Sequence, residues 1–122
     1  MIFKESQPIY VQIAERLSDE ILSEHFKVDE RIPGVREYTA LLEVNINTTM
    51  KAYDLLSTRG IIYTKRGLGY FVTNNAPQII MKQRCKEFRE IYLPDLFRRM
   101  NQLGLDPKDL EKVWEEFNKG KF

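Results

Sequence analysis

One helix is predicted at Ile46–Arg59. Hydrogen-bonding side chains cluster at its start, and they are Asn45, Asn47, Thr48 and Lys51. Asn45 suits the N-cap, because its amide oxygen can accept a hydrogen bond from a free backbone N–H of the first turn. Asn47 offers both a donor and an acceptor and could pair with adenine, while Thr48 and Lys51 are suited to phosphate. These groups therefore favour contact with DNA.

The two faces of this helix differ in polarity. Four residues at helical spacing should be buried: Thr49, Ala52, Tyr53 and Leu56. The outward face then holds Ile46, Asn47, Met50, Lys51 and Asp54. Solvated polar residues would explain part of that face, but Ile46 and Met50 are two apolar side chains one turn apart. Such a pair needs a partner, and thymine methyl groups are one candidate.

Another helix is predicted immediately before Ile46–Arg59 in the sequence. It covers Val35–Leu42, and a tight turn at Glu43–Asn45 follows it, which is the spacing of a helix-turn-helix. Arg36 should point outward from its first turn, where a guanidinium could bind a phosphate or a guanine edge. The alternative for Arg36 is a surface ion pair with Glu37 or Glu43.

After the helix Ile46–Arg59 the sequence predicts a β-hairpin. Ile62–Thr64 and Tyr70–Val72 are rich in strand-forming residues, and the turn between them contains two glycines. The tip combines the charges of Lys65 and Arg66 with exposed backbone at Gly67 and Gly69, which suits close approach to phosphates and a minor groove. A generic hairpin turn would also favour glycine, but the position after two helices is that of the wing of a winged helix.

Three further segments should support this arrangement. Residues 8–24 form a helix whose apolar stripe packs on the later helices, and residues 26–33 form a loop anchored by Phe26 and Ile32. Residues 74–77 are predicted to be a short linker.

Beyond the linker, apolar residues recur at threes and fours in two helices. Pro94 should bend the first helix near Ile91, Gly104 should end it, and Asp106 should cap the second. Their apolar positions are Met81, Phe88, Tyr92, Leu96, Met100, Leu103, Leu110, Val113, Trp114 and Phe117. Two helices cannot hide this much apolar surface against each other, so we expect burial across a two-fold axis. Packing of the pair back onto the first domain is the alternative.

Composition narrows the class of protein. The chain has 122 residues, 43% hydrophobic content and a net charge of +1, so DNA affinity would depend on local clusters of basic residues. One cysteine, Cys85, excludes an internal disulfide and a Cys-based zinc site, and one histidine, His25, leaves little for catalysis. We therefore expect no enzyme activity, no metal and no cofactor. The start of the chain lacks signal-peptide features, and no apolar run could cross a bilayer, so we expect a cytoplasmic protein.

The predicted fold class is mainly α with a small β-hairpin. A winged helix-turn-helix at residues 1–75 is followed by a two-helix dimerisation segment at residues 76–122.

Four stretches of the sequence resemble the DNA-binding domain of GntR-type bacterial transcriptional regulators: PIYVQIAERLSDEI, RIPGVRE, VNINTTMKAYDLL and GIIYTKRGLGYFV. The resemblance covers residues 8–73, somewhat over half of the chain. It implies a bacterial DNA-binding protein in which Arg36, Asn45 to Thr48, Arg66 and Gly67 contact DNA. The short C-terminal tail resembles the YtrA-like branch, whose C-terminal helices dimerise and whose members often regulate transporter operons.

The sequence departs from the family pattern at several positions. Gly34 stands where a serine is usual, and acidic residues stand where glycines are usual: Glu24, Asp29 and Glu43. Ile46 and Met50 occupy positions where the family commonly has arginine in the recognition helix. We therefore predict a more A·T-rich site, contacted through Asn47 and through thymine methyl groups.

Together these observations predict a homodimeric transcriptional regulator, a repressor, that binds a palindromic operator in double-stranded DNA. Its DNA-binding residues would be Arg36, Asn45, Ile46, Asn47, Thr48, Met50, Lys51, Lys65, Arg66, Gly67 and Gly69. The alternative is a winged-helix module that binds protein without specific DNA binding. A small-molecule effector between the C-terminal helices is left open, since Phe88, Tyr92 and Trp114 could form aromatic walls, although core packing is the commoner use of such rings.

Overall fold

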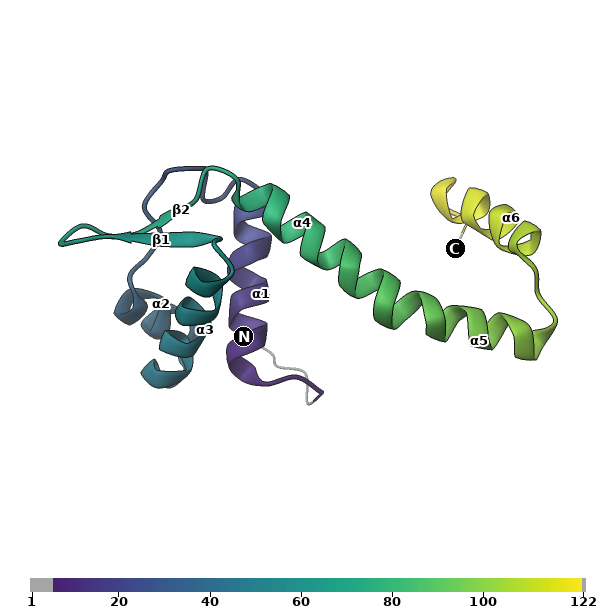
Figure 1. Ribbon diagram of the computed structural model, residues 1–122, viewed down its shortest axis with the longest axis horizontal. Coiled ribbons are helices and arrows are strands. Elements are labelled where there is room, and N and C mark those ends of the chain that lie inside the picture. The colour runs from purple at the N-terminus through teal and green to yellow at the C-terminus, as the bar shows by residue number, and fades with distance from the viewer. Residues whose placement is uncertain (1–5, 122) are drawn as a thin grey trace. The chain divides into compact units, whose positions relative to one another are not determined.

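The computed structural model describes residues 6–121, and its contacts divide the chain after Gln83 into two units. The first unit contains three helices and a hairpin: α1 (Ile9–Leu22), α2 (Val35–Leu42), α3 (Ile46–Thr58), β1 (Ile62–Lys65) and β2 (Gly69–Val72). In Figure 1 the hairpin extends away from these helices, as the wing of a winged helix does. The predicted fold class, mainly α with a small β-hairpin, is confirmed.

A single hydrophobic core holds the first unit together. From α1 it takes Ile13, Leu17 and Ile21, which are at most 2% exposed, as the apolar stripe predicted. The other buried side chains include Ile32, Tyr38, Leu42, Ala52, Tyr53, Leu56, Ile61, Ile62 and Val72. Each helix and the hairpin thus contributes to the same core, and its burial fixes the elements relative to one another.

The segment before α2 was predicted to be a loop, and this is wrong for Arg31. Arg31 forms an antiparallel bridge with Phe71 of β2. The flanking backbone also pairs with β2, since Ile32 N–H donates to the Tyr70 carbonyl and Val72 N–H donates to the Glu30 carbonyl, both at 3.0 Å. The predicted anchor Ile32 is buried. The segment therefore extends the sheet on the side of β2 opposite β1.

The predicted linker at residues 74–77 is already partly helical. Helix α4 (Ala76–Glu87) begins there, and Ala76 and Ile80 are buried in the core of the first unit. The boundary expected after residue 75 thus falls just before α4, whereas the contacts divide the chain after Gln83. Burial of the first turns of α4 explains the later boundary.

The second unit contains a π-helical turn and two α-helices: η1 (Phe88–Tyr92), α5 (Leu93–Leu103) and α6 (Pro107–Asn118). The π-turn lies where Pro94 was expected to bend a continuous helix. Pro94 has no N–H to donate to the Glu90 carbonyl, and its ring crowds that carbonyl. The Leu93 N–H instead reaches the Phe88 carbonyl, five residues back.

The connection between α5 and α6 forms as the sequence predicted. Gly104 ends α5 with a φ of +70°, and the Leu105 N–H donates to the Met100 carbonyl at 2.9 Å. Asp106 caps α6 in a capping box, in which the Asp106 and Asp109 side chains each accept a backbone N–H of the other residue.

Three acidic residues hold left-handed backbone conformations in the first unit. Glu24, Asp29 and Glu43 have φ values of 63°, 64° and 55°. These are the positions where the sequence departs from the glycines usual in the resembled family. The chain has kept the backbone turn at each position without the residue that adopts it most easily. Between residues 6 and 121, no helix is both long and apolar enough to cross a membrane.

Candidate nucleic-acid interface

The start of α3 has the predicted cap. Asn45 is extended, with φ −73° and ψ 136°, and its side-chain oxygen accepts the Asn47 N–H at 2.8 Å. The Thr48 and Thr49 N–H groups donate to the Asn45 carbonyl at 3.0 and 3.2 Å. The cap therefore satisfies a free backbone N–H in the first turn of α3.

The inner face of α3 is fully enclosed, as predicted. Thr49, Ala52, Tyr53 and Leu56 are all 0% exposed. The Tyr53 hydroxyl donates to the Pro33 carbonyl at 2.5 Å, which ties α3 to the residue just before α2. Burial, with a smaller contribution from Glu20, raises the pKa of Tyr53 well above its ordinary value, so its hydroxyl stays protonated.

A row of tyrosine rings continues this link through the core. The rings of Tyr38 and Tyr53 lie 6.1 Å apart, and those of Tyr53 and Tyr70 lie 4.9 Å apart, edge to face. The Tyr38 hydroxyl donates to the Glu20 carboxylate on α1, and burial raises the pKa of Tyr38. Through these rings α1, α2, α3 and β2 are held in one frame.

The outer face of α3 is open to solvent. Ile46 is 40% exposed and Met50 is 48% exposed, and the side chains of Asn47, Lys51 and Asp54 are also exposed. The Lys51 ammonium lies 5.8 Å from the centre of the Tyr10 ring, at the start of α1. The face therefore presents two apolar side chains around one amide, with a cation at its edge.

Arg36 is exposed on the first turn of α2. The alternative proposed for it was an ion pair with Glu37 or Glu43. Among the described residues, Glu37 pairs instead with Arg31, at 3.5 Å. Arg36 is therefore an exposed side chain on α2, the helix that precedes α3 in the helix-turn-helix.

The wing presents its tip differently from the prediction at one position, Gly69. Arg66 and Gly67 are exposed, as expected. The Lys65 ammonium lies 4.4 Å from the centre of the Phe71 ring, over an aromatic pair that Phe71 forms with Tyr63. Gly69 is half-buried, with a φ of +108°, and faces the Arg31 side chain. Lys65 and Arg66 are therefore both exposed at the tip, and the Lys65 ammonium also lies over an aromatic ring.

Sequence reasoning missed Arg31 and Leu68. Arg31 donates from Nε to the Leu68 carbonyl at 3.1 Å, across 37 residues of sequence, and the Leu68 side chain is 61% exposed at the tip. No helical or strand periodicity marks Arg31, because the segment around it contributes a single bridge to the sheet. The two glycines of the tip were the available signal, since one of them makes room for a neighbouring side chain.

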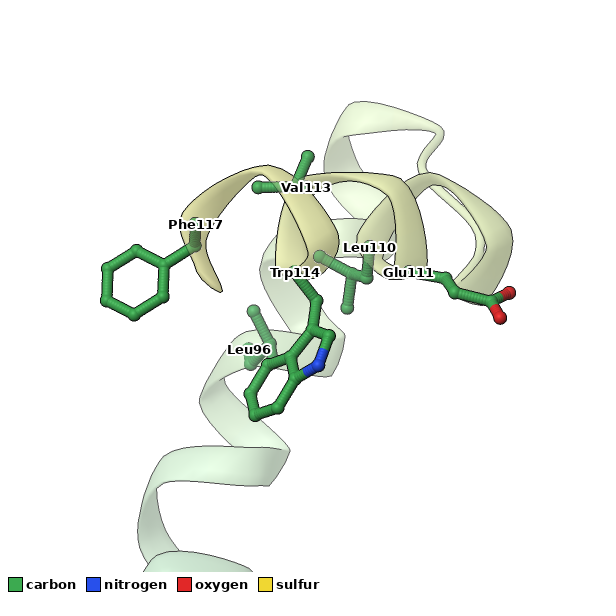
Figure 2. Close-up of a pocket in the computed structure, with 6 residues that line it drawn as sticks. All are labelled: Leu96, Leu110, Glu111, Val113, Trp114 and Phe117. Carbon is green, nitrogen blue, oxygen red and sulfur yellow. The ribbon is translucent and has the colours of Figure 1, made fainter. Parts of the chain in front are cut away.

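In the second unit, the expected dimerisation residues are largely exposed in the single chain. Leu103, Trp114 and Phe117 are 72%, 68% and 60% exposed, whereas Met100 is only 6% exposed and packs within its own chain. An open groove of about 520 Å³ is lined by Leu96, Leu110, Glu111, Val113, Trp114 and Phe117. Figure 2 shows the Trp114 indole reaching from α6 toward Leu96 of α5. The predicted positions Phe88 and Tyr92 are exposed as well, and so is Met81, which lies on α4 in the first unit.

The three-helix core, the exposed face of α3 and the hairpin define a winged helix-turn-helix DNA-binding protein. Residues 9–72 match the family described as bacterial regulatory proteins, gntR family. The chain belongs to this family of DNA-binding transcriptional regulators.

Relatives and solved structures extend the similarity over nearly the whole chain. The chain is 30% identical to the transcriptional regulator YhcF of Bacillus subtilis, over 97% of this chain and 96% of that protein. It is 33% identical to the transcriptional repressor YtrA of B. subtilis, over 92% of this chain and 83% of that protein.

Among solved structures, a GntR-family regulator from Bacteroides thetaiotaomicron has a TM-score of 0.84 and 37% identity, covering 94% of this chain and all of that one. The DNA-binding domain of AraR, solved in complex with operator ORR3, has a TM-score of 0.54 and 29% identity, covering 60% of this chain and 88% of that one.

Proposed function

We propose that this protein is a homodimeric transcriptional repressor that binds a palindromic operator on cytoplasmic DNA. The observation that carries the proposal is the open outer face of α3 beside a wing whose tip exposes Arg66 and Gly67. In this arrangement α3 enters the major groove and the wing contacts the adjacent minor groove and phosphates. The operator complex of AraR supports the mode of binding, and the name of YtrA as a repressor supports the sign of regulation.

DNA contact is assigned to the residues that the two helices and the wing expose. On this proposal Arg36 and Arg66 bind phosphate or base edges, and Asn47 pairs with adenine. Lys51 and Lys65, which lie over aromatic rings, extend from them to phosphate. The remaining contacts come from Asn45, Ile46, Thr48, Met50, Gly67 and Gly69.

The experiment starts with selection of a duplex from a random library by the wild-type protein. Fluorescence anisotropy then measures affinity for that duplex at rising salt. Arg36→Ala and Arg66→Ala should each weaken binding about tenfold or more and reduce the salt slope, by about 0.9 for each phosphate that the variant no longer neutralises. Arg16→Ala is the matched control, because Arg16 pairs with Glu20 on α1. Failure to select any duplex, or binding that does not depend on salt, would contradict DNA binding and favour a protein-interaction module.

The base composition of the selected site tests the outer face of α3. Because Ile46 and Met50 are exposed there, we expect A·T-rich sequence under α3. Uracil in place of thymine removes only the methyl group, so it should weaken binding at contacted positions. A G·C-rich core, or equal affinity for the uracil duplex, would refute the apolar contacts.

The sign of regulation needs a test in cells. The selected duplex, placed in the promoter of a reporter gene, should lower expression when the protein is produced. The Arg66→Ala variant, expressed to the same level, should restore expression. Increased expression with the wild-type protein would identify an activator.

A second copy of this chain is the proposed occupant of the α5–α6 groove. The groove is lined almost entirely by apolar side chains, and Trp114 alone leaves 68% of its surface exposed. Taking about 250 Å² for a Trp side chain gives about 170 Å², which is worth about 4 kcal/mol if buried.

Trp114→Ala should therefore raise the dimer dissociation constant at least about 100-fold. Light scattering after size exclusion measures the mass. Leu41→Ala, an apolar truncation of a side chain that is 63% exposed on α2, is the control and should remain dimeric. A monomeric wild type, or an unchanged Trp114→Ala dimer, would contradict this interface.

A further inference from the structure

Arg31 connects three parts of the first unit that are separate in sequence. Its backbone bridges Phe71 in β2, and its Nε donates to the Leu68 carbonyl at the tip of the wing at 3.1 Å. Its Nη2 lies 3.5 Å from Oε1 of Glu37 on α2. One side chain thus links the wing tip to the first helix of the helix-turn-helix.

Gly69 is the residue that makes room for this link. A Cβ built on Gly69 would lie 3.1 Å from the Arg31 Nε, and its φ of +108° disfavours any side chain. Because Arg31 pairs with Phe71 across the sheet, its side chain lies on the same face of β2 as Phe71 and Gly69. The guanidinium can cross this face only where no side chain stands, and Gly69 provides that position.

Two hydrogen bonds to the Leu68 backbone hold the wing tip. The turn is closed by the Leu68 N–H, which donates to the Lys65 carbonyl at 2.9 Å, and this bond is local to the tip. The bond from Arg31 spans 37 residues and orients the tip against the rest of the unit. It reaches α2 through Glu37, the neighbour of Arg36. Arg31 therefore links the wing tip, which carries Arg66, to α2, which carries Arg36. Both of those exposed arginines are assigned to DNA.

We propose that Arg31 is a positioning residue for DNA binding, which holds the wing tip so that Arg66 and Gly67 meet the duplex while α3 lies in the major groove. The inference rests on the proposed function, and it assigns Arg31 a role that acts through Leu68, Gly69 and Glu37. The guanidinium geometry is needed for this role, since a single fork donates to a carbonyl and to a carboxylate at once.

A double-mutant cycle separates positioning from direct contact. Affinity is measured on the duplex selected by the wild-type protein, for Arg31→Ala, Arg66→Ala and the double variant. Arg31→Ala should weaken binding about threefold to tenfold, the range expected for one hydrogen bond. The double variant should bind no more weakly than Arg66→Ala. If Arg31 acts only by positioning Arg66, its removal has no further effect once the Arg66 side chain is gone. Multiplied effects would overturn the proposal and make Arg31 a DNA contact.

Arg31→Lys provides the second discriminator. It keeps the positive charge but cannot form the fork, so we expect it to bind as weakly as Arg31→Ala, with the salt slope of Arg66→Ala. Full affinity in Arg31→Lys would overturn the proposal, because a phosphate contact needs only the charge. Thermal unfolding should be close to wild type for both variants, since the Arg31 side chain is exposed. If the wild type selects no duplex, the proposed function fails first; if it does and Arg31→Ala binds normally, this inference alone fails.

Discussion

Replacement of the left-handed acidic residues by glycine should stabilise the protein. A non-glycine residue in the left-handed region costs about 1–2 kcal/mol, and glycine costs about 0.5–1 kcal/mol in backbone entropy. Glu24 and Glu43, with φ of 63° and 55° and exposed side chains, should therefore each gain about 0.5–1 kcal/mol when changed to glycine. Asp29 should gain less, because aspartate tolerates this region better and its carboxylate accepts the Tyr63 hydroxyl at 3.4 Å.

Scanning calorimetry of the single variants and of the double variant Glu24→Gly/Glu43→Gly measures these gains. The double variant should unfold about 4–8 °C above wild type. Glu30→Gly is the matched control: Glu30 is an exposed acidic residue without a positive φ, so only the entropy cost applies and the variant should be less stable. Equal destabilisation in Glu24→Gly, Glu43→Gly and Glu30→Gly would refute the assignment of strain.

Three further changes test the cap of α3, the tyrosine core and the end of α5. Asn45→Ala should lower the stability of the first unit by about 1 kcal/mol in urea unfolding, because the Asn47 N–H loses its acceptor, whereas Asn45→Asp should retain it. Tyr53→Phe should cost about 1–2 kcal/mol at neutral pH, since the Pro33 carbonyl loses its donor. Because burial raises the pKa of Tyr53, ionisation favours the unfolded chain above about pH 10, so wild-type stability should fall as the pH rises past that value and Tyr53→Phe should fall less steeply. Gly104→Ala should cost about 1 kcal/mol in thermal unfolding from its φ of +70° alone, since a Cβ there meets no atom within 4 Å; no loss would show that α5 ends without this turn.

The sequence predicted the elements that repeat a pattern and the residues that end them. Helix α2 was predicted with the bounds that the structure has, because apolar spacing and the following turn agree, and Asn45 was predicted as a cap from its chemistry. The inner face of α3 was predicted for the same reason: a helical period places Thr49, Ala52, Tyr53 and Leu56 on one side.

What the sequence did not predict depends on contacts between distant residues. Nothing local shows that Arg31 joins the sheet, since one bridging residue has no period, or that its side chain crosses Gly69 to the tip of the wing. Residues 74–77 were predicted to be a linker, yet α4 begins at Ala76 and Pro77 lies in its first turn, where proline is tolerated. The π-turn before Pro94 was predicted only as a bend, because the helix period is the same on either side of it.

The position of the single tryptophan makes its fluorescence specific to one part of the chain. The single tryptophan of the chain, Trp114, lies in α6, whereas the tyrosines that bridge α1, α2, α3 and β2 are Tyr38, Tyr53 and Tyr70. Light that excites only indole therefore gives fluorescence from α6 and none from the winged helix. Emission from this one side chain, which is 68% exposed in the single chain, would shift to shorter wavelength when water leaves its surroundings. The unlabelled protein thus carries its own reporter for the proposed association of two copies, and that reporter lies in a different unit from the residues assigned to DNA.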